Sequence, residues 1–319
     1  MNEIIFLTIF LVFVAFMLFL DLGVFHKKDA EVTTKEAAIW TSIWIGCALL
    51  FYLFLLFFGD LLHGGDPSKN AQMSLEYLTG YVIEKSLSID NIFVMLLLFA
   101  SFNIERKYYH RVLYYGILGA VVLRFVFIFA AYALIERFNW VLLIFGIILL
   151  ITGIKMFFAK KEEGKDAKNH PLVKFFAKRN MISEPHGHDF FKKVNGKWLI
   201  TPLFLVLIMV ELSDIVFAFD SIPAIFSVTT DPFIVFFSNI FAILGLRSLF
   251  FLLENMMQKF QYLTVALAFL LAFIGSKMII HYVWHFSIPT YISLLVILGI
   301  LILSIIASVI KNRLNVNKC

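Results

Sequence analysis

The sequence has little charge and almost no cysteine. Only 15% of its 319 residues are Asp, Glu, Lys or Arg, whereas soluble proteins carry about 25%. The two cysteines, Cys47 and Cys319, are too few and too far apart in the chain for a disulfide framework or a cysteine-based metal site. No glycine-rich nucleotide loop of the Walker type occurs, so ATP is not expected to drive any process here.

Apolar residues take the place of the missing charge. They make up 61% of the chain, and the mean hydropathy is +0.90. They form blocks near the length of about 20 residues that crosses a bilayer, at residues 3–23, 38–60, 76–100, 111–134, 139–159, 199–226, 232–253, 262–282 and 289–310. The first block lacks the basic region of a cleaved signal peptide and is counted as a span. We therefore predict an all-α polytopic membrane protein with nine transmembrane helices in a single domain, residues 1–319.

The basic residues predict which side of the membrane each loop faces. Twenty Lys and Arg lie in segments that follow odd-numbered spans, and only Lys69 and Arg137 follow even-numbered ones. The positive-inside rule then places the N-terminus outside and the C-terminus in the cytoplasm. The net charge of +5 is then explained by cytoplasmic loops that lie beside anionic lipid, and it does not indicate nucleic-acid binding.

Residues 160–198 form the longest polar segment, which this topology places in the cytoplasm. It begins with KKEEGKDAK, a charge run typical of a solvated linker. Asn195-Gly196 near its end predicts a β-hairpin with a type I′ turn. We expect His186 and His188 to be loop histidines and not a metal sensor, because two ligands without partners make a weak site.

Two parts of the chain resemble each other, which indicates an internal repeat. Three matches occur in the same order: EKSLSIDNIFV (84–94) with DIVFAFDSIPA (214–224), Arg124 with Arg247, and Lys155 with Lys277. Each unit, 76–159 and 199–282, holds three spans, so the second enters the membrane in the opposite sense; 289–310 is the last transmembrane helix. Inverted repeats of this kind place a substrate site near the midplane, between the two halves.

Seven polar residues within the spans are candidates for that site. An ionisable side chain at mid-bilayer costs about 2.5–3.5 kcal/mol, so it normally lines a pathway and has a partner. The candidates combine carboxylate, amide and hydroxyl oxygens: Glu84, Asp90, Asn91, Glu211, Asp214, Asp220 and Ser221. Such ligands select Mg²⁺, Ca²⁺ or Mn²⁺ over Zn²⁺ or Cu⁺. We predict a divalent-metal site at which Asp90 and Asp220 face each other across a pseudo-two-fold axis.

Five basic residues also lie within apolar blocks. We expect four of them to act as supporting counter-charges and ties between helices: Arg124, Lys155, Arg247 and Lys277. The fifth, Lys85, is expected to snorkel toward the membrane surface.

These motifs resemble the TerC/Alx family of bacterial membrane proteins. The similarity covers nearly the whole chain, and its longest motif is TPLFLVLIMVELSDIVFAFDSIPAIFSVT at 201–229. The family is named for tellurite resistance, belongs to a lysine-exporter-like superfamily, and is similar to manganese exporters. The resemblance implies Mn²⁺ as an exported substrate, a place in the bacterial cytoplasmic membrane, the seven candidates in or near the pathway, and no bound organic cofactor.

Other functions stay open beside that expectation. An intramembrane aspartyl protease also needs two membrane Asp, but the sequence surroundings typical of that class are absent, so we do not expect an enzyme. The alternative is a membrane partner or chaperone that works with the secretion machinery and supports metalation or secretion of exported proteins. An exporter of lysine or another organic cation is disfavoured because no aromatic cage accompanies the acids.

Outward transport of a divalent cation needs an energy source. Movement against an inside-negative potential costs about 4.6 kcal/mol per 100 mV. We expect proton antiport, because desolvated carboxylates can exchange a metal ion for protons. Coupling to Na⁺ and facilitated passage are the alternatives.

Overall fold

The structure is a computed structural model that describes most of the chain. The described residues are 8, 10–17, 33–61, 67–138, 140–158, 174, 176, 178, 182, 189–194, 197–254, 262–286 and 288–316. Among these, the side chains of Asp90, Phe93, Leu263, Thr264 and residues 312–316 are not described. His186, His188 and the Asn195-Gly196 turn lie outside the described residues, as does most of the 160–198 segment.

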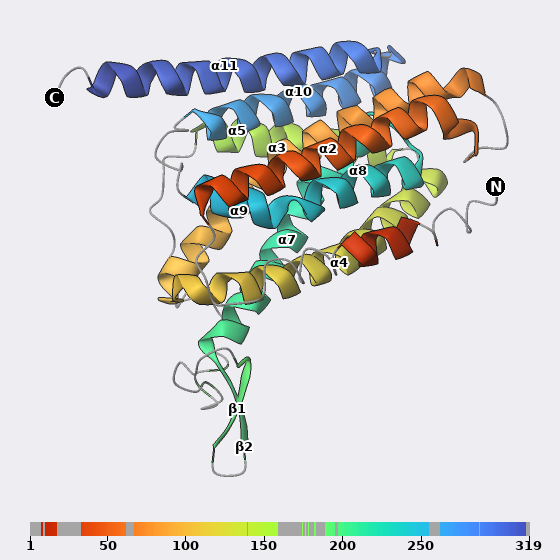
Figure 1. Ribbon diagram of the computed structural model, residues 1–319. Helices are drawn as coiled ribbons and strands as arrows, with labels where there is room; N and C mark the ends of the chain where they lie inside the picture. Colours follow the sequence, from red (N-terminus) through yellow and green to blue (C-terminus); the bar gives the residue numbers. More distant parts are fainter. Residues whose placement is uncertain are drawn as a thin grey trace.

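Long helices and one pair of short strands make up the described part of the chain. The helices are α2 (Thr34–Phe58), α3 (Asn70–Ser101), α4 (Tyr109–Arg137), α5 (Val141–Phe158), α7 (Pro202–Phe226), α8 (Pro232–Leu244), α9 (Leu246–Glu254), α10 (Leu263–Trp284) and α11 (Thr290–Val316), and the strands are β1 (Phe191–Val194) and β2 (Lys197–Ile200). Residues 10–17 are also helical. Most helices run in the same general direction, with α11 at the top of the view, and the strands lie at the bottom, below α4 (Figure 1).

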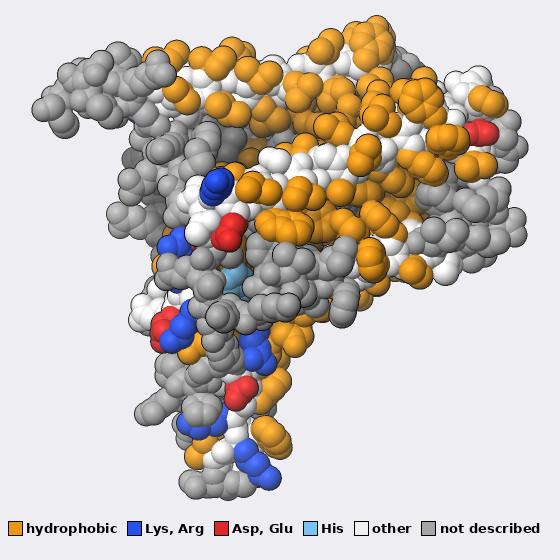
Figure 2. Space-filling model, viewed as in Figure 1, with side chains coloured by type: hydrophobic (Ala, Val, Ile, Leu, Met, Phe, Trp, Pro, Cys, Tyr) orange, Lys and Arg blue, Asp and Glu red, His pale blue; other side chains and the backbone are white. Residues whose placement is uncertain are grey.

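The helices have the length and composition of membrane spans. Six described helices are long and apolar enough to cross a bilayer, and α8 with α9 makes a seventh if the bent pair is one span. The 32-residue α3 is not among them; it carries Glu76, Glu84, Lys85 and Asp90. Figure 2 shows hydrophobic side chains over the helices, while charged side chains gather toward the hairpin. The chain is therefore an all-α multi-pass membrane protein, and nine spans remain a prediction.

The predicted span 232–253 is not one continuous helix. It breaks at Gly245, where α8 gives way to α9 at an angle of 42°. Lys85 of α3 points to this break and donates to the Ala242 carbonyl oxygen at 3.1 Å. A Cβ at Gly245 would lie 2.8 Å from the Lys85 Nζ, so glycine leaves room for the lysine. The expectation that Lys85 snorkels to the membrane surface is wrong, because its ammonium holds a carbonyl at the end of α8.

Helices α5 and α10 form the most extensively packed pair of described elements. A Cβ at Gly153 of α5 would lie 2.7 Å from the Ala272 backbone nitrogen. A Cβ at Gly275 of α10 would lie 2.6 Å from the Leu150 backbone nitrogen. Glycine at both positions lets the two backbones approach, as small residues commonly do between membrane helices.

The β-hairpin lies where the sequence predicts it. β1 and β2 pair antiparallel with Val194 opposite Lys197, which leaves Asn195-Gly196 as the connection. Thr201 joins the hairpin to α7: its hydroxyl donates to the Asp189 carbonyl oxygen at 2.8 Å and accepts from the backbone N–H of Phe204. The hairpin projects away from the helices at the start of α7 (Figure 1).

Candidate functional site

The candidate site lies where two apolar clusters meet. On α3, Leu87 belongs to one cluster and Ile92 to the other. On α7, Ala218 and Val210 divide in the same way, and Asp214 lies between them. Polar residues at this level are surrounded by apolar side chains along both helices, which strengthens electrostatic contacts among them.

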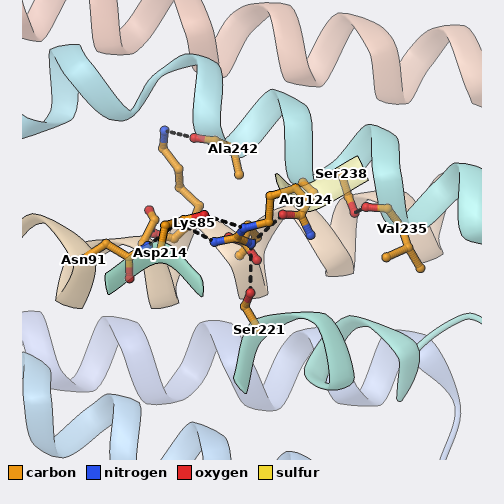
Figure 3. A network of polar contacts seen from close by, with 11 residues as sticks. Lys85, Asn91, Arg124, Asp214, Ser221, Val235, Ser238 and Ala242 are labelled. Atoms are coloured by element: carbon orange, nitrogen blue, oxygen red, sulfur yellow. Dashed lines mark hydrogen bonds and ion pairs between the residues drawn. The ribbon is translucent and has the colours of Figure 1, made fainter. Parts of the chain in front are cut away.

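Arg124 of α4 is the centre of the polar contacts (Figure 3). It is fully buried, and its Nη1 donates to Glu84 Oε1 at 2.5 Å and to Ser221 Oγ at 2.8 Å. The same nitrogen donates to Asn239 Oδ1 at 2.6 Å. Nε and Nη2 donate to the two carboxylate oxygens of Asp214, at 3.2 and 3.0 Å. Arg124 thus has the counter-charge role expected from the sequence, and it connects acids from both predicted repeat units.

Two oxygen atoms of this cluster have no donor within the described part of the chain. Asn91 donates through Nδ2 to Asp214 Oδ1 at 3.4 Å, which leaves Asn91 Oδ1 buried and without a partner there. Glu84 Oε2 is buried in the same condition. Buried acceptors normally have a partner. Glu84 Oε2 is therefore available to a bound cation or to a proton, and Asn91 Oδ1 to a bound cation.

A cavity of about 320 Å³ opens beside the cluster. Thr152 and four apolar side chains line part of it. The rest is lined by six of the predicted site or supporting residues: Glu84, Asn91, Arg124, Lys155, Asp220 and Ser221. Asp220 of α7 is only partly buried and accepts from the Thr152 hydroxyl of α5 at 3.3 Å. The cavity therefore joins an accessible carboxylate to the buried cluster.

The other candidates lie apart from this cavity or cannot be placed. Glu211 packs its carboxylate against Gly119 of α4, where an added Cβ would overlap it. Its Oε2 is buried and has no partner among the described residues. Asp90 is part of α3, but its side chain is not described, so its predicted position opposite Asp220 stays a prediction.

The remaining supporting charges line different spaces. Arg247 lines a narrow crevice that also contains Glu84, Asn91 and Asp214. Lys277 lines a larger cavity of about 810 Å³ with Glu76. Lys155 and Lys277 are repeat counterparts in the sequence, yet each faces its own cavity.

The side chains of the cluster are suitable ligands for a hard divalent cation, but they are not arranged to coordinate one in this structure. Glu84, Asp214, Asn91 and Ser221 supply oxygen atoms, the ligands that Mg²⁺, Ca²⁺ and Mn²⁺ prefer. Among the described residues, no three Asp, Glu, His or Cys side chains lie close enough to hold one ion. The position between the two buried carboxylates is taken by the Arg124 guanidinium.

Sequence reasoning missed two residues of the site. Asn239 of α8 binds Arg124, and Thr152 of α5 binds Asp220. Asn239 is the one amide side chain in the apolar block 232–253. It was a usable signal, because polar residues inside membrane spans usually bind a buried partner. Thr152 gave little signal, because a threonine can satisfy its hydroxyl within its own helix.

Comparison with known proteins identifies relatives over almost the whole length. The family described as "Integral membrane protein TerC family" matches residues 69–315. An uncharacterized membrane protein of Myxococcus xanthus is 48% identical over 307 residues, covering 95% of this chain and 92% of its own. Alx of Escherichia coli K12, a proposed membrane-bound redox modulator, is 46% identical over 299 residues, covering 93% and 92% of the two chains.

A third relative extends the match to both ends of the chain. An uncharacterized membrane protein of Rickettsia felis is 40% identical over 315 residues, covering 98% of this chain and 99% of its own. No solved structure matches the chain significantly. The relatives therefore describe a family of full-length membrane proteins, and the site geometry comes from this structure.

Proposed function

The chain belongs to the TerC family of integral membrane proteins, and on that premise we propose that it exports a divalent metal cation across the bacterial cytoplasmic membrane. Mn²⁺ is the proposed substrate. The protein acts as a carrier and not as an enzyme, it needs no organic cofactor, and its partners are the metal ion and the lipid bilayer.

The observation that carries this proposal is the pair of unsatisfied oxygens beside the cavity. Glu84 Oε2 and Asn91 Oδ1 are buried and lack donors within the described residues, and both side chains line the space that Asp220 also lines. A cation that enters at Asp220 would meet oxygen ligands from α3 and α7 in the same cavity. The chemistry supports a hard divalent ion; the preference for Mn²⁺ over Mg²⁺ or Ca²⁺ rests on the family resemblance.

We further propose the nine-span topology with an inverted repeat, units 76–159 and 199–282. The α5–α10 crossing supports it. The alignment of Lys155 with Lys277 pairs residue 153 with 275 and residue 150 with 272. Gly153 approaches Ala272, and Gly275 approaches Leu150, so each contact is the counterpart of the other. Such reciprocity is what a pseudo-two-fold axis between the two helices predicts.

The orientation follows from the charge distribution. An outside N-terminus and a cytoplasmic C-terminus place the hairpin and its lysines on the cytoplasmic side. Lys192, Lys193 and Lys197 are at least partly exposed, as expected for a segment beside an anionic leaflet. Proton antiport is the proposed coupling, because carboxylates that lose a cation in an apolar setting favour protonation.

A second candidate function is docking of an exported protein or of the secretion machinery. The observation in its favour is the hairpin, where Trp198 and Phe191 are 66% and 46% exposed beside three lysines. Exposed aromatic residues of this kind are frequent at interfaces. Metal flux that persists when Trp198 and Phe191 are replaced by serine would separate docking from transport.

The test of the proposed function is flux into vesicles reconstituted with the purified full-length chain. Intact protein should carry Mn²⁺ in a saturable way, and Asp220→Ala and Asp90→Ala should not. A proton gradient opposite to the metal movement should accelerate flux. Absence of saturable flux with folded intact protein would refute export, and indifference to any pH gradient would refute proton antiport alone.

A further inference from the structure

Arg124 occupies the position that a transported cation would take. Its guanidinium lies between Glu84 of α3 and Asp214 of α7, with Nη1 at 2.5 Å and Nη2 at 3.0 Å from their oxygens. It also uses Ser221 Oγ, a predicted metal ligand. A metal ion at this same position would displace Arg124, because two cations held side by side between the carboxylates would repel each other.

Arg124 pairs with both carboxylates at this position. Glu84 and Asp214 are each almost fully buried, with the Arg124 guanidinium between them, and Arg247 lines the adjoining crevice with the same two acids. Lys85 directs its ammonium to the Ala242 carbonyl oxygen and not to these carboxylates. Glu84 Oε2 remains without a donor in the described part of the chain. A divalent cation between the carboxylates would supply a partner for that oxygen.

The guanidinium has a place to move. Arg124 lines the cavity of about 320 Å³, and Asp220 lines the same cavity next to Ser221, which Arg124 already contacts. Within the described part of the chain, Asp220 accepts a hydrogen bond from Thr152 at 3.3 Å, which is longer than a charge-assisted hydrogen bond. An acid is therefore close by to receive the guanidinium when it leaves Glu84 and Asp214.

We propose that Arg124 is a tethered counter-cation, which holds Glu84 and Asp214 in the empty carrier and moves toward Asp220 when a divalent cation takes its place. This inference rests on the proposed export function. In the empty carrier the arginine prevents two buried carboxylates from standing bare, an arrangement that is strongly unfavourable in an apolar interior. The metal-free protein can then change conformation, with or without bound protons, as net export requires.

The account predicts that removal of Arg124 tightens cation binding and stops net transport. Without Arg124, the oxygen ligands are always available to the cation, so the apparent dissociation constant falls. If Arg124 occupies the site for about 90% of the time in the intact protein, its removal lowers this constant about tenfold. The empty carrier is then held back by its bare carboxylates. Exchange of internal for external Mn²⁺ should persist in Arg124→Gln, whereas net efflux should be lost.

The experiment measures binding of radioactive Mn²⁺ to the purified full-length chain, with vesicle flux as the second readout. Arg124→Gln should bind about tenfold tighter than the intact protein. The double variant Arg124→Gln/Glu84→Gln should lose that gain, because only one carboxylate remains. Binding by Arg124→Gln that is equal to or weaker than that of the intact protein would overturn the inference.

A milder variant keeps the test decisive if Arg124→Gln does not fold. Asn239→Leu removes one acceptor of Arg124 and no carboxylate. It should tighten Mn²⁺ binding about two- to fivefold, the equivalent of one hydrogen bond; no change or weaker binding would overturn the inference. If the intact protein carries Mn²⁺ but neither variant binds more tightly, this inference fails alone. If the folded intact protein neither binds nor carries Mn²⁺, the proposed function fails and the inference with it.

Discussion

The two predicted repeat units, α3–α5 and α7–α10, make counterpart backbone contacts where α5 crosses α10 but place their charges differently. Gly153 and Gly275 make counterpart contacts across the α5–α10 crossing. The charges are not mirrored: Arg124 of the first half lies between Glu84 and Asp214, whereas Asp220 of the second half faces the cavity beside Thr152. The difference in charge gives the candidate site an occupied inner position and an accessible acid.

The largest expected effect separates the two aspartates of α7. Asp214→Asn removes the carboxylate that binds two nitrogens of Arg124 and should lower the free energy of unfolding by about 3 kcal/mol, the typical loss when one partner of a buried ion pair is removed. Asp220→Asn is the matched control on the same helix and should cost under about 0.5 kcal/mol. Thermal unfolding in detergent measures both; equal losses would contradict the difference in charge environment.

The second prediction asks whether both halves contribute to transport. Asp90→Asn and Asp220→Asn should each reduce Mn²⁺ flux by roughly tenfold or more, as loss of a metal-site contact generally does. The two variants should leave the unfolding temperature nearly unchanged. A large loss for Asp220→Asn alone would show that the first half supplies only the inner position and would break the mirrored assignment.

The third prediction tests the counterpart backbone contacts of α5 and α10. Gly153→Ala and Gly275→Ala each place a Cβ within 2.7 Å of backbone atoms of the facing helix and should each destabilise by about 1–3 kcal/mol. Gly46→Ala is the control, since nothing lies within 4 Å of its added Cβ. It should be neutral or stabilising by up to about 1 kcal/mol. Clearly unequal losses at Gly153 and Gly275 would argue against a two-fold relation between α5 and α10.

The smallest predicted effect concerns Lys85, whose counterpart in the second half is Ile215. Lys85→Met removes the donor to the Ala242 carbonyl oxygen at the end of α8 and should destabilise by about 1 kcal/mol. Ile215→Met is the matched control and should change stability less, because it nearly conserves volume. Greater stability of Lys85→Met would mean that the lysine does not stabilise the break between α8 and α9.

The sequence was sufficient for features that depend on local pattern. The apolar blocks predicted a multi-pass helical protein, and Asn195-Gly196 predicted a hairpin with the observed pairing of Val194 with Lys197. The pairing of Arg124 with acids followed from the cost of a charge inside a membrane. These inferences need only spacing and chemistry along one segment, which the sequence contains.

The sequence was insufficient where helices meet. Asn239 joins the site because its face of α8 is turned toward Arg124. The rotation of a helix about its axis is set by packing against neighbouring helices, which the sequence does not show. The sequence does not distinguish Gly245 from an ordinary glycine within a span. The reason for the break is tertiary, because Lys85 of α3 fills the space beside Gly245. Glu211 was grouped with Asp214 by its spacing of three residues, but it packs against Gly119 of α4 instead.

The most direct test of the account is cellular manganese, measured by elemental analysis in a manganese-loaded strain that lacks its own exporters. The strain would express the intact protein or the Asp90→Asn/Asp220→Asn double variant at equal membrane abundance. The account predicts that the intact protein lowers cellular manganese and that the double variant leaves it at the level of the empty strain. Equal manganese in all three strains, with both proteins folded in the membrane, would contradict manganese export.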